Sequence, residues 1–221
     1  MKGIFFFLFF ATTHFLTAQE VKPSLPLSSI STESYASDLK MAVVKFNNAA
    51  TPSQYDAAFI AFEQLNKVNP RDWLCPYYIS LIQSRRSMNE WGDRERFADE
   101  SIRWINMAKA IQLNDEVLCG ESLAYTAKMA IKPFLRWLTY EAKINGSLKK
   151  ALTLNPLNPR VYVLQASIQK NMPTFAGGGC KSAKPLYEKA TQLFTAKSNH
   201  TEEWPSWGKG SLQQIKVGCK F

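Results

Sequence analysis

The sequence predicts an all-α protein, an α-α superhelix (solenoid) of stacked helical hairpins. Strand signals are scarce, whereas long segments carry apolar residues at steps of three and four, which is the pattern of amphipathic helices. Four of these segments also share one internal pattern, which recurs at intervals of 45, 41 and 39 residues. Self-similarity at such a period is typical of helical hairpins that stack on one another.

The chain begins with the layout of a secretory signal peptide, which we assign to residues 1–18. Lys2 precedes an apolar run at residues 4–11, and small residues follow near the expected cleavage point. A membrane anchor is the weaker alternative, because a spanning helix needs about 20 apolar residues. Residues 19–32, which are rich in proline and serine, predict a flexible leader. The helical repeat domain then occupies residues 33–221.

The helices follow in order, and several of their ends have a chemical reason. Thr51 is a good N-cap, and Pro52 behind it suits the first turn. Asn69 and Asn155 are each followed by proline, which disfavours the helical conformation in the residue before it. The expected helices span residues 33–48, 52–68, 71–87, 93–113, 115–130, 132–154, 159–170, 181–195 and 205–216.

The shared pattern places three residues at steps of four and three, so that all three lie on one helix face. Its four occurrences are Ala58/Phe62/Leu65, Arg103/Met107/Ala110, Ile144/Leu148/Ala151 and Ala183/Tyr187/Ala190. A proline follows five positions after the first and third sets. The second set departs at Arg103, and the second and fourth lack the proline. An irregular helical bundle is the alternative that this pattern leaves open.

These features resemble tetratricopeptide repeats, whose second helix carries small, aromatic and small residues at these steps before a proline. Their first helix opens with W-x2-L-G, which Trp204-x2-Trp207-Gly208 resembles with tryptophan in place of leucine. Tyr162 and Ala166 fit the aromatic and small positions of another first helix. The units are longer than the family's thirty-four residues, so the resemblance implies hairpins with insertions and first helices that face the concave side.

A glycine-rich stretch, NMPTFAGGG, lies at residues 171–179. A glycine-rich turn before a helix can hold a phosphate, but a P-loop needs G-x-x-x-x-G-K-[ST] after a strand, and here a cysteine stands between the last glycine and the lysine. We expect a structural hairpin loop, and whether residues 177–179 bind anything stays open. The stretch resembles loops of exported repeat proteins of the Bacteroidota type. More distantly, it is similar to the T-component proteins associated with TRAP transporters.

Four cysteines remain after the signal peptide, and an even number in an exported chain permits disulfides. We expect the pairs Cys180–Cys219 and Cys75–Cys119. The chain has no C-x-x-C motif, and His200 is the only histidine after the signal peptide. Zinc needs four clustered ligands, so we predict no metal site and no cofactor.

The sequence offers no catalytic constellation. A serine or cysteine nucleophile needs a positioned base, and His200 lies in a polar stretch with no G-x-S-x-G motif elsewhere. The acidic residues between positions 93 and 100 alternate with arginines at the start of a helix, where acids suit the helix dipole. We therefore predict that the protein is not an enzyme.

The chain is basic, with a formal net charge of +9 from 27 Lys and Arg against 18 Asp and Glu. A basic exported protein is attracted to anionic surfaces and acidic proteins. Nucleic acid is a poorer partner, because export removes the protein from it and the basic residues are dispersed. We predict a periplasmic or secreted protein with no transmembrane segment in the mature chain.

The favoured function is a non-enzymatic scaffold of the cell envelope that captures a peptide or partner protein on its concave face. Aromatic and basic residues on the expected first helices suit an acidic or aromatic segment. These candidate partner-binding residues are Tyr77, Tyr78, Arg85, Arg86, Tyr125 and Lys128. The alternative is a small-molecule or solute-binding accessory protein of a transport system, with a deep apolar pocket. The partner, the pathway and the oligomeric state stay open.

Overall fold

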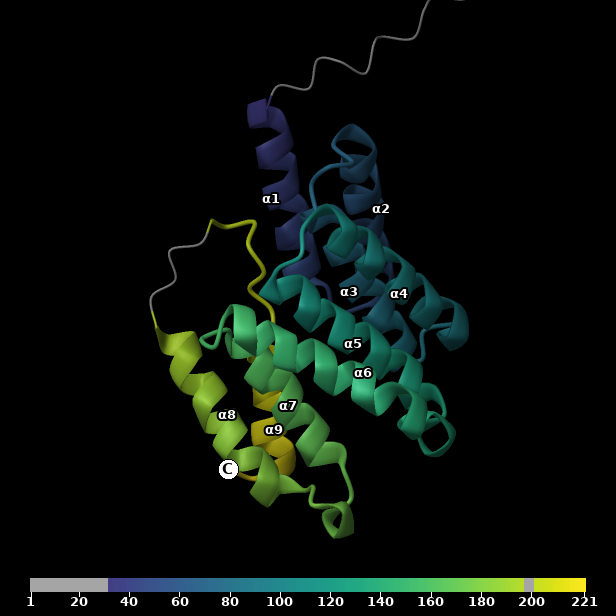
Figure 1. The fold of residues 1–221 in the computed structure, drawn as a ribbon. Helices are drawn as coiled ribbons and strands as arrows, with labels where there is room; N and C mark the ends of the chain where they lie inside the picture. The colour runs from purple at the N-terminus through teal and green to yellow at the C-terminus, as the bar shows by residue number, and fades with distance from the viewer. Residues whose placement is uncertain (1–31, 197–200) are drawn as a thin grey trace, which may run out of the picture. The chain divides into compact units, whose positions relative to one another are not determined.

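A computed structural model describes residues 32–196 and 201–221. Within these residues the chain forms nine α-helices, one short 3-10 helix and no strand, which confirms the all-α class (Figure 1). The predicted signal peptide, residues 1–18, and nearly all of the predicted leader lie outside the described residues. The helices are α1 (Thr32–Asn48), α2 (Pro52–Val68), α3 (Leu74–Met88), α4 (Arg94–Ile111), α5 (Asp115–Ile131), α6 (Pro133–Leu154), α7 (Pro159–Asn171), η1 (Thr174–Ala176), α8 (Cys180–Thr195) and α9 (Lys209–Cys219).

Side-chain caps fix where several helices begin. At α2, the N–H of Gln54 donates to the Thr51 hydroxyl, and the Gln54 side chain accepts from the Thr51 N–H at 3.1 Å. This reciprocal pair satisfies two N–H groups that the helix itself cannot use. Asp93 and Asn114 cap α4 and α5 in the simpler way, each by accepting from an N–H three residues on.

Consecutive helices pack as pairs: α1 with α2, α3 with α4, α5 with α6, and α7 with α8. Each odd-numbered helix also contacts the next odd-numbered one, from α1 through to α9. As a result α3 and α5 have neighbours on several sides, and most of their side chains are buried. The largest fully buried side chains include Tyr77, Tyr78 and Phe62.

The second occurrence of the internal pattern was assigned in the wrong register. Arg103, Met107 and Ala110 are all exposed, whereas the buried face of α4 carries Ser101, Ile105 and Ala108. The buried set keeps the steps of four and three. It also makes the first two intervals equal, since 101 − 58 and 144 − 101 are both 43. Residue types alone favour the wrong register, because they do not reveal which face of α4 is buried.

The last helix begins later than predicted, at Lys209. The segment from Trp204 to Gly208 therefore precedes α9, and it does not open a helix as the W-x2-L-G resemblance implied. Gly208 has a φ of +115°, a backbone conformation that residues other than glycine rarely adopt. This turn directs Trp207 into the interior, where its side chain is buried.

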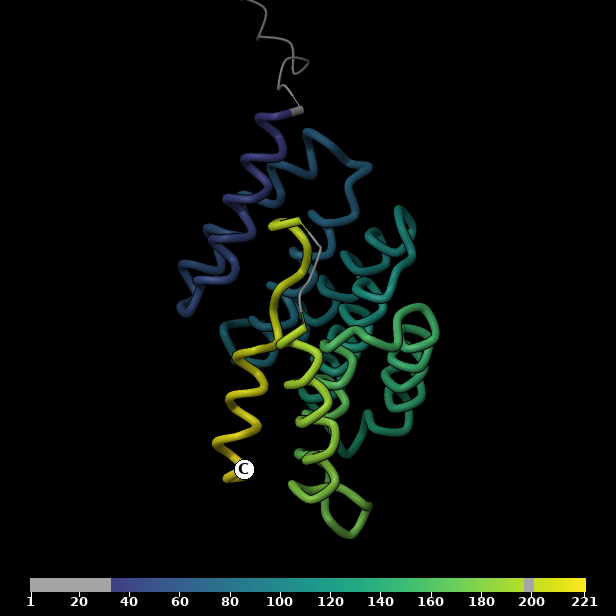
Figure 2. Tube along the Cα trace, turned by 90° about the vertical axis from the view of Figure 1, so that its left-hand side faces the viewer, coloured from purple at the N-terminus to yellow at the C-terminus, as the bar shows by residue number. Residues whose placement is uncertain are grey.

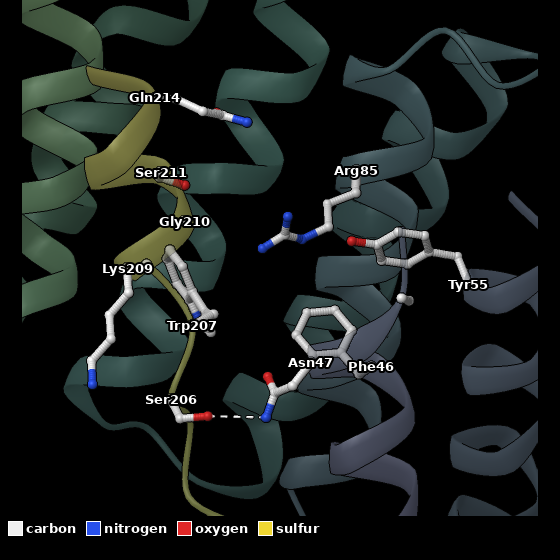
Figure 3. Close-up of a pocket in the computed structure, with 12 residues that line it drawn as sticks. Phe46, Asn47, Tyr55, Arg85, Ser206, Trp207, Lys209, Gly210, Ser211 and Gln214 are labelled. Carbon is white, nitrogen blue, oxygen red and sulfur yellow. Dashed lines mark hydrogen bonds between the residues drawn. The ribbon is translucent and has the colours of Figure 1, made fainter. Parts of the chain in front are cut away.

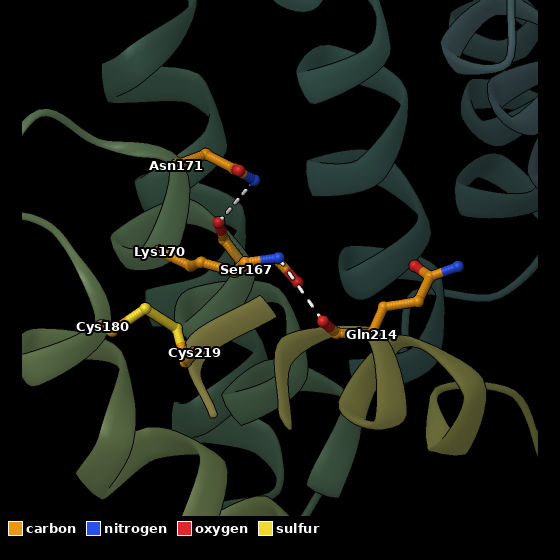
Figure 4. The surroundings of a disulfide bond; sticks show 6 residues. All are labelled: Ser167, Lys170, Asn171, Cys180, Gln214 and Cys219. Atoms are coloured by element: carbon orange, nitrogen blue, oxygen red, sulfur yellow. Dashed lines mark hydrogen bonds between the residues drawn. A yellow bond between two sulfur atoms is a disulfide. The ribbon is translucent and has the colours of Figure 1, made fainter. Parts of the chain in front are cut away.

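One of the two predicted disulfides is present. Cys180 at the start of α8 is bonded to Cys219 at the end of α9, with Cα atoms 5.4 Å apart (Figure 4). The pair Cys75–Cys119 was wrong, because both cysteines are free and buried. The Cys75 sulfur lies 3.5 Å from the hydroxyl of Tyr35 on α1. The Cys119 thiol instead lies within electrostatic range of the buried ion pair between Glu116 and Arg160. The two thiols thus face different neighbours.

The glycine-rich loop between α7 and α8 is closed by its own backbone. The N–H groups of residues 177, 178 and 179 donate to the carbonyl oxygens of Thr174, Pro173 and Gln169, at 3.0, 3.1 and 2.7 Å. A Cβ on residue 178 would lie 2.2 Å from the carbonyl oxygen of Met172, so only glycine fits there. These N–H groups are therefore engaged within the loop and are not available to hold a phosphate.

Candidate functional site

A pocket of about 480 Å³ lies between the N-terminal helices and the segment that leads into α9. The C-terminal end of α1 approaches the segment before α9, as Figure 2 shows. The Asn47 side chain donates to the Ser206 hydroxyl at 3.1 Å across this junction. The lining residues are Phe46, Asn47, Ala49, Tyr55, Arg85, Ser206, Trp207, Gly208, Lys209, Gly210, Ser211 and Gln214.

Three aromatic side chains give the pocket its apolar walls. The rings of Phe46 and Tyr55 meet edge to face with centroids 6.1 Å apart, and Trp207 lies on the opposite side (Figure 3). All three residues are at least nine-tenths buried by the protein. Rings fixed in this way lose little conformational freedom when a ligand binds.

The pocket has a positive charge that no lining residue neutralises. The guanidinium of Arg85 extends from α3 toward the α9 segment, near the Tyr55 hydroxyl (Figure 3). The Arg85 Nε atom is buried without a hydrogen-bond partner, and within the described residues Arg85 makes no ion pair. Lys209 also lines the pocket, but its ammonium lies 5.9 Å from the centre of the Phe194 ring on α8, and no Asp or Glu lines the pocket. A buried donor without a partner is costly, so an anionic ligand would stabilise this site.

A chain of buried polar groups holds Trp207 in the pocket wall. The indole N–H of Trp207 donates to the Tyr77 hydroxyl at 2.7 Å, and the Tyr77 hydroxyl donates to Glu116 at 3.3 Å. The Nε atom of Arg160 donates to both Glu116 oxygens, at 2.8 and 2.6 Å, and Asn158 donates to the same carboxylate at 2.7 Å. Burial raises the pKa of Glu116, and the ion pair with Arg160 opposes that rise.

Of the six candidate partner-binding residues, the structure places Arg85 alone in the pocket. Tyr77 and Tyr78 are fully buried, which corrects the expectation that they line an open concave face. The Tyr78 hydroxyl donates to the backbone carbonyl of Glu203 at 3.1 Å, so both tyrosines fix the segment before α9 from inside. They contribute to the site by holding Trp207 and the backbone of Glu203, in the segment that forms one wall of the pocket.

The other candidates are engaged elsewhere. Arg86 forms an ion pair with Asp56. Lys128 contacts Glu95 at 2.8 Å and Asp99 at 2.5 Å. Tyr125 is half-buried beside the ring of Tyr140. None of the three lines the pocket, and the acidic partners of the two cations come from the chain itself.

Sequence reasoning missed most of the pocket. Phe46, Tyr55 and Lys209 carried no motif, and Trp207 was noticed only for its resemblance to the opening of a repeat. The available signal was the pair Trp207-Gly208 after Pro205, because a proline and a glycine so close to a tryptophan predict a turn that carries a large ring. Nothing in the local pattern indicates that this ring lies opposite Phe46.

Within residues 32–196 and 201–221, no helix has both the length and the hydropathy that a bilayer span requires. The same part of the chain has no group of three or more His, Cys, Asp or Glu side chains placed to hold a metal ion.

Comparisons with known proteins point to one solved structure. No protein-family model matches the chain, and no curated protein matches it. The fold is similar to that of the HusA haemophore from Porphyromonas gingivalis, with a TM-score of 0.74 and 28% sequence identity. The similarity covers 84% of this chain and 92% of that chain, so it extends over nearly the whole helical fold.

Proposed function

We propose that this protein is an exported, non-enzymatic binding protein that captures haem or a closely related porphyrin in the pocket between α1 and α9. The observation that carries the proposal is the half-buried Arg85, whose Nε atom is buried without a hydrogen-bond partner and which has no acidic partner in the described residues, among fixed aromatic rings. The similarity to a haemophore supports the choice of ligand.

The chemistry of a porphyrin suits this lining. Its flat aromatic ring can pack against Phe46 and Trp207, since aromatic surfaces prefer offset or edge contacts. Its propionate carboxylates can accept hydrogen bonds from Arg85, and a guanidinium pairs with a carboxylate through two parallel bonds. A volume of about 480 Å³ falls within the usual range for a pocket that encloses a small ligand.

Recognition in this proposal rests on the ring and the carboxylates. Among the residues that line the pocket, the Tyr55 hydroxyl is the one group of a type that commonly ligates haem iron, since the lining contains no His, Cys or Met. Because recognition by the ring and the carboxylates does not involve the iron, we expect metal-free protoporphyrin to bind with an affinity similar to that of haemin. A phenolate ligand from Tyr55 would instead make haemin the much stronger ligand.

The pocket favours the second of the two functions that the sequence left open. A small-molecule carrier needs an apolar pocket with a few polar groups, and the α1–α9 junction provides both. Capture of an acidic peptide needs exposed basic and aromatic residues. Tyr77, Tyr78, Arg86 and Lys128 are instead buried or paired within the chain.

The superhelical arrangement and the export of the chain belong to the same proposal. Contacts between successive odd-numbered helices, and the first two intervals of 43 residues in the corrected register, support tetratricopeptide-like stacking. The Cys180–Cys219 disulfide supports an oxidising compartment such as the periplasm or the cell exterior.

A haemin titration followed by absorbance tests the proposal. Loss of a hydrogen bond to a charged group costs about 1.5–3 kcal/mol, so Arg85→Gln should weaken haemin binding by roughly tenfold to 150-fold. Lys216→Gln is the matched control, because Lys216 is an exposed cation on α9 that does not line the pocket. Equal affinity in the wild type and the Arg85 variant would contradict the proposed site.

A further inference from the structure

The outer face of α6 carries apolar side chains that nothing in the described structure covers. Phe134, Leu138 and Leu135 are 97%, 92% and 79% exposed. They follow one another at adjacent and four-residue steps, so they form one ridge on the first turns of the helix. Helix α6 packs on α5 and touches α7, and it lies at the front of the bundle in Figure 1 and at the right-hand edge in Figure 2.

The same helix is strongly basic. Together with its N-cap residue, α6 contains five cations and one acid, which gives a net charge of 5 − 1, or +4. These residues are Lys132, Arg136, Lys143, Lys149 and Lys150, against Glu141. Arg136 is paired with Glu95 of α4 at 2.6 Å, so the exposed cations of the helix are the four lysines. Lys149 is exposed and lies eleven residues after Leu138, about three helical turns, so it shares the outer face with the ridge.

From this combination we propose that α6 docks on an anionic phospholipid bilayer. Helices that lie in the membrane interface join Phe and Leu on one side with Lys and Arg around them. Phe134 and Leu138 project from the surface and line neither of the described pockets. A projecting ring can enter the headgroup region of a bilayer, which needs no preformed complementary cavity. The lysines then neutralise anionic headgroups.

Charge argues for lipid over a second copy of the chain. In a two-fold dimer the same patch meets itself, so the exposed lysines around the ridge of each copy would be brought together. Burial of Phe134, Leu135 and Leu138 would have to overcome this like-charge repulsion in a small interface. An anionic lipid surface supplies the opposite charge over the whole helix.

The docking face and the pocket are separate. No residue of α6 lines the α1–α9 pocket. A protein held to a bilayer through α6 would therefore keep this pocket free of lipid, and the proposal does not depend on the identity of the cargo.

Co-sedimentation of the full chain with vesicles tests the proposal, with phosphatidylcholine vesicles compared with vesicles that also contain phosphatidylglycerol. We expect binding to the anionic vesicles and at least about tenfold weaker binding for the double variant Phe134→Ser/Leu138→Ser. The matched control is Phe175→Ser, because Phe175 is 92% exposed in the α7–α8 loop and should leave binding unchanged. These side chains are exposed, so the variants should also keep the wild-type unfolding midpoint.

A second variant separates charge from apolar insertion. Each lysine near an anionic surface contributes about 1 kcal/mol, so Lys149→Gln/Lys150→Gln should weaken binding to anionic vesicles by roughly 25-fold at low salt. Binding to neutral vesicles should hardly change. Three results would overturn the proposal: no vesicle binding, equal losses for the Phe134 and Phe175 variants, or retention of the chain by an acidic polypeptide while the vesicles stay unbound.

Discussion

Removal of the Cys180–Cys219 disulfide is predicted to lower the stability of the fold substantially. Helix α9 is short and otherwise packs on α7 and α8 through a small cluster that includes Leu212 and Ile215. The two cysteines are 39 residues apart in sequence. The chain-entropy relation for a loop of this length gives about 13 cal/mol/K, or about 4 kcal/mol at 25 °C. Measured values for native disulfides are typically about 2–4 kcal/mol.

The perturbation is the double variant Cys180→Ser/Cys219→Ser, studied by urea unfolding and by thermal melting. For a domain of this size, each kcal/mol lowers the melting temperature by about 2–4 °C, so the midpoint should fall by roughly 8–16 °C. Because the disulfide acts mainly on the unfolded chain, haemin affinity without urea should change little. Lys209, Ser211 and Gln214 of α9 would leave the pocket at a lower urea concentration than in the wild type.

The matched control is Cys75→Ala, which removes a free thiol and leaves the disulfide in place. Reductant should destabilise this control and the wild type to the same extent, and it should not affect the double serine variant. A loss of less than about 1 kcal/mol in the double variant would refute the reasoning, since the entropic effect would then be absent.

Three further predictions follow from the described contacts. Iodoacetamide should leave the free thiols of Cys75 and Cys119 unmodified in the native protein and label both in denaturant without reductant. Burial raises the pKa of Cys75 to about 12 and also raises the pKa of Cys119. A labelled thiol in mass spectrometry of the native protein would contradict this prediction. Hydrogen bonds from Arg136 and Lys128 lower the pKa of Glu95 from 4.5 to about 2, so this carboxylate stabilises the fold above pH 4.5 and its contribution is lost as the pH falls from 4.5 to 2. Acid unfolding of Glu95→Gln should show a weaker pH dependence in that window, and an unchanged profile would contradict the assignment. Trp207→Phe removes the donor to Tyr77 and should cost about 1–3 kcal/mol in urea unfolding, whereas a neutral effect would show that the bond is dispensable.

Much of the fold could be predicted because the signals for it are local. The apolar period of each helix, the Thr51 cap and the prolines after Asn69 and Asn155 all act within a few residues. The errors arose where tertiary burial decides the outcome. Arg103 and Met107 fit the repeat by type, yet the burial of Ser101 and Ile105 sets the true register.

The pocket was harder to predict because its walls lie far apart in sequence. Phe46 and Trp207 are separated by 161 positions, and they meet only because the segment before α9 passes the C-terminal end of α1. Arg85 was identified as a basic residue on a first helix, but its neighbour Arg86 looked equivalent. The structure separates them, since Arg86 is paired with Asp56 and Arg85 has no acidic partner in the described residues.

The most direct test of the central claim is to map the bound ligand by amide chemical shifts, with metal-free protoporphyrin as a diamagnetic probe. The proposed function predicts that the largest changes fall at Phe46–Ala49, at Arg85 and along residues 206–214, and that Arg85→Gln weakens them. Changes that cluster on another part of the fold, such as the shallow pocket between α6, α7 and α8, would contradict it.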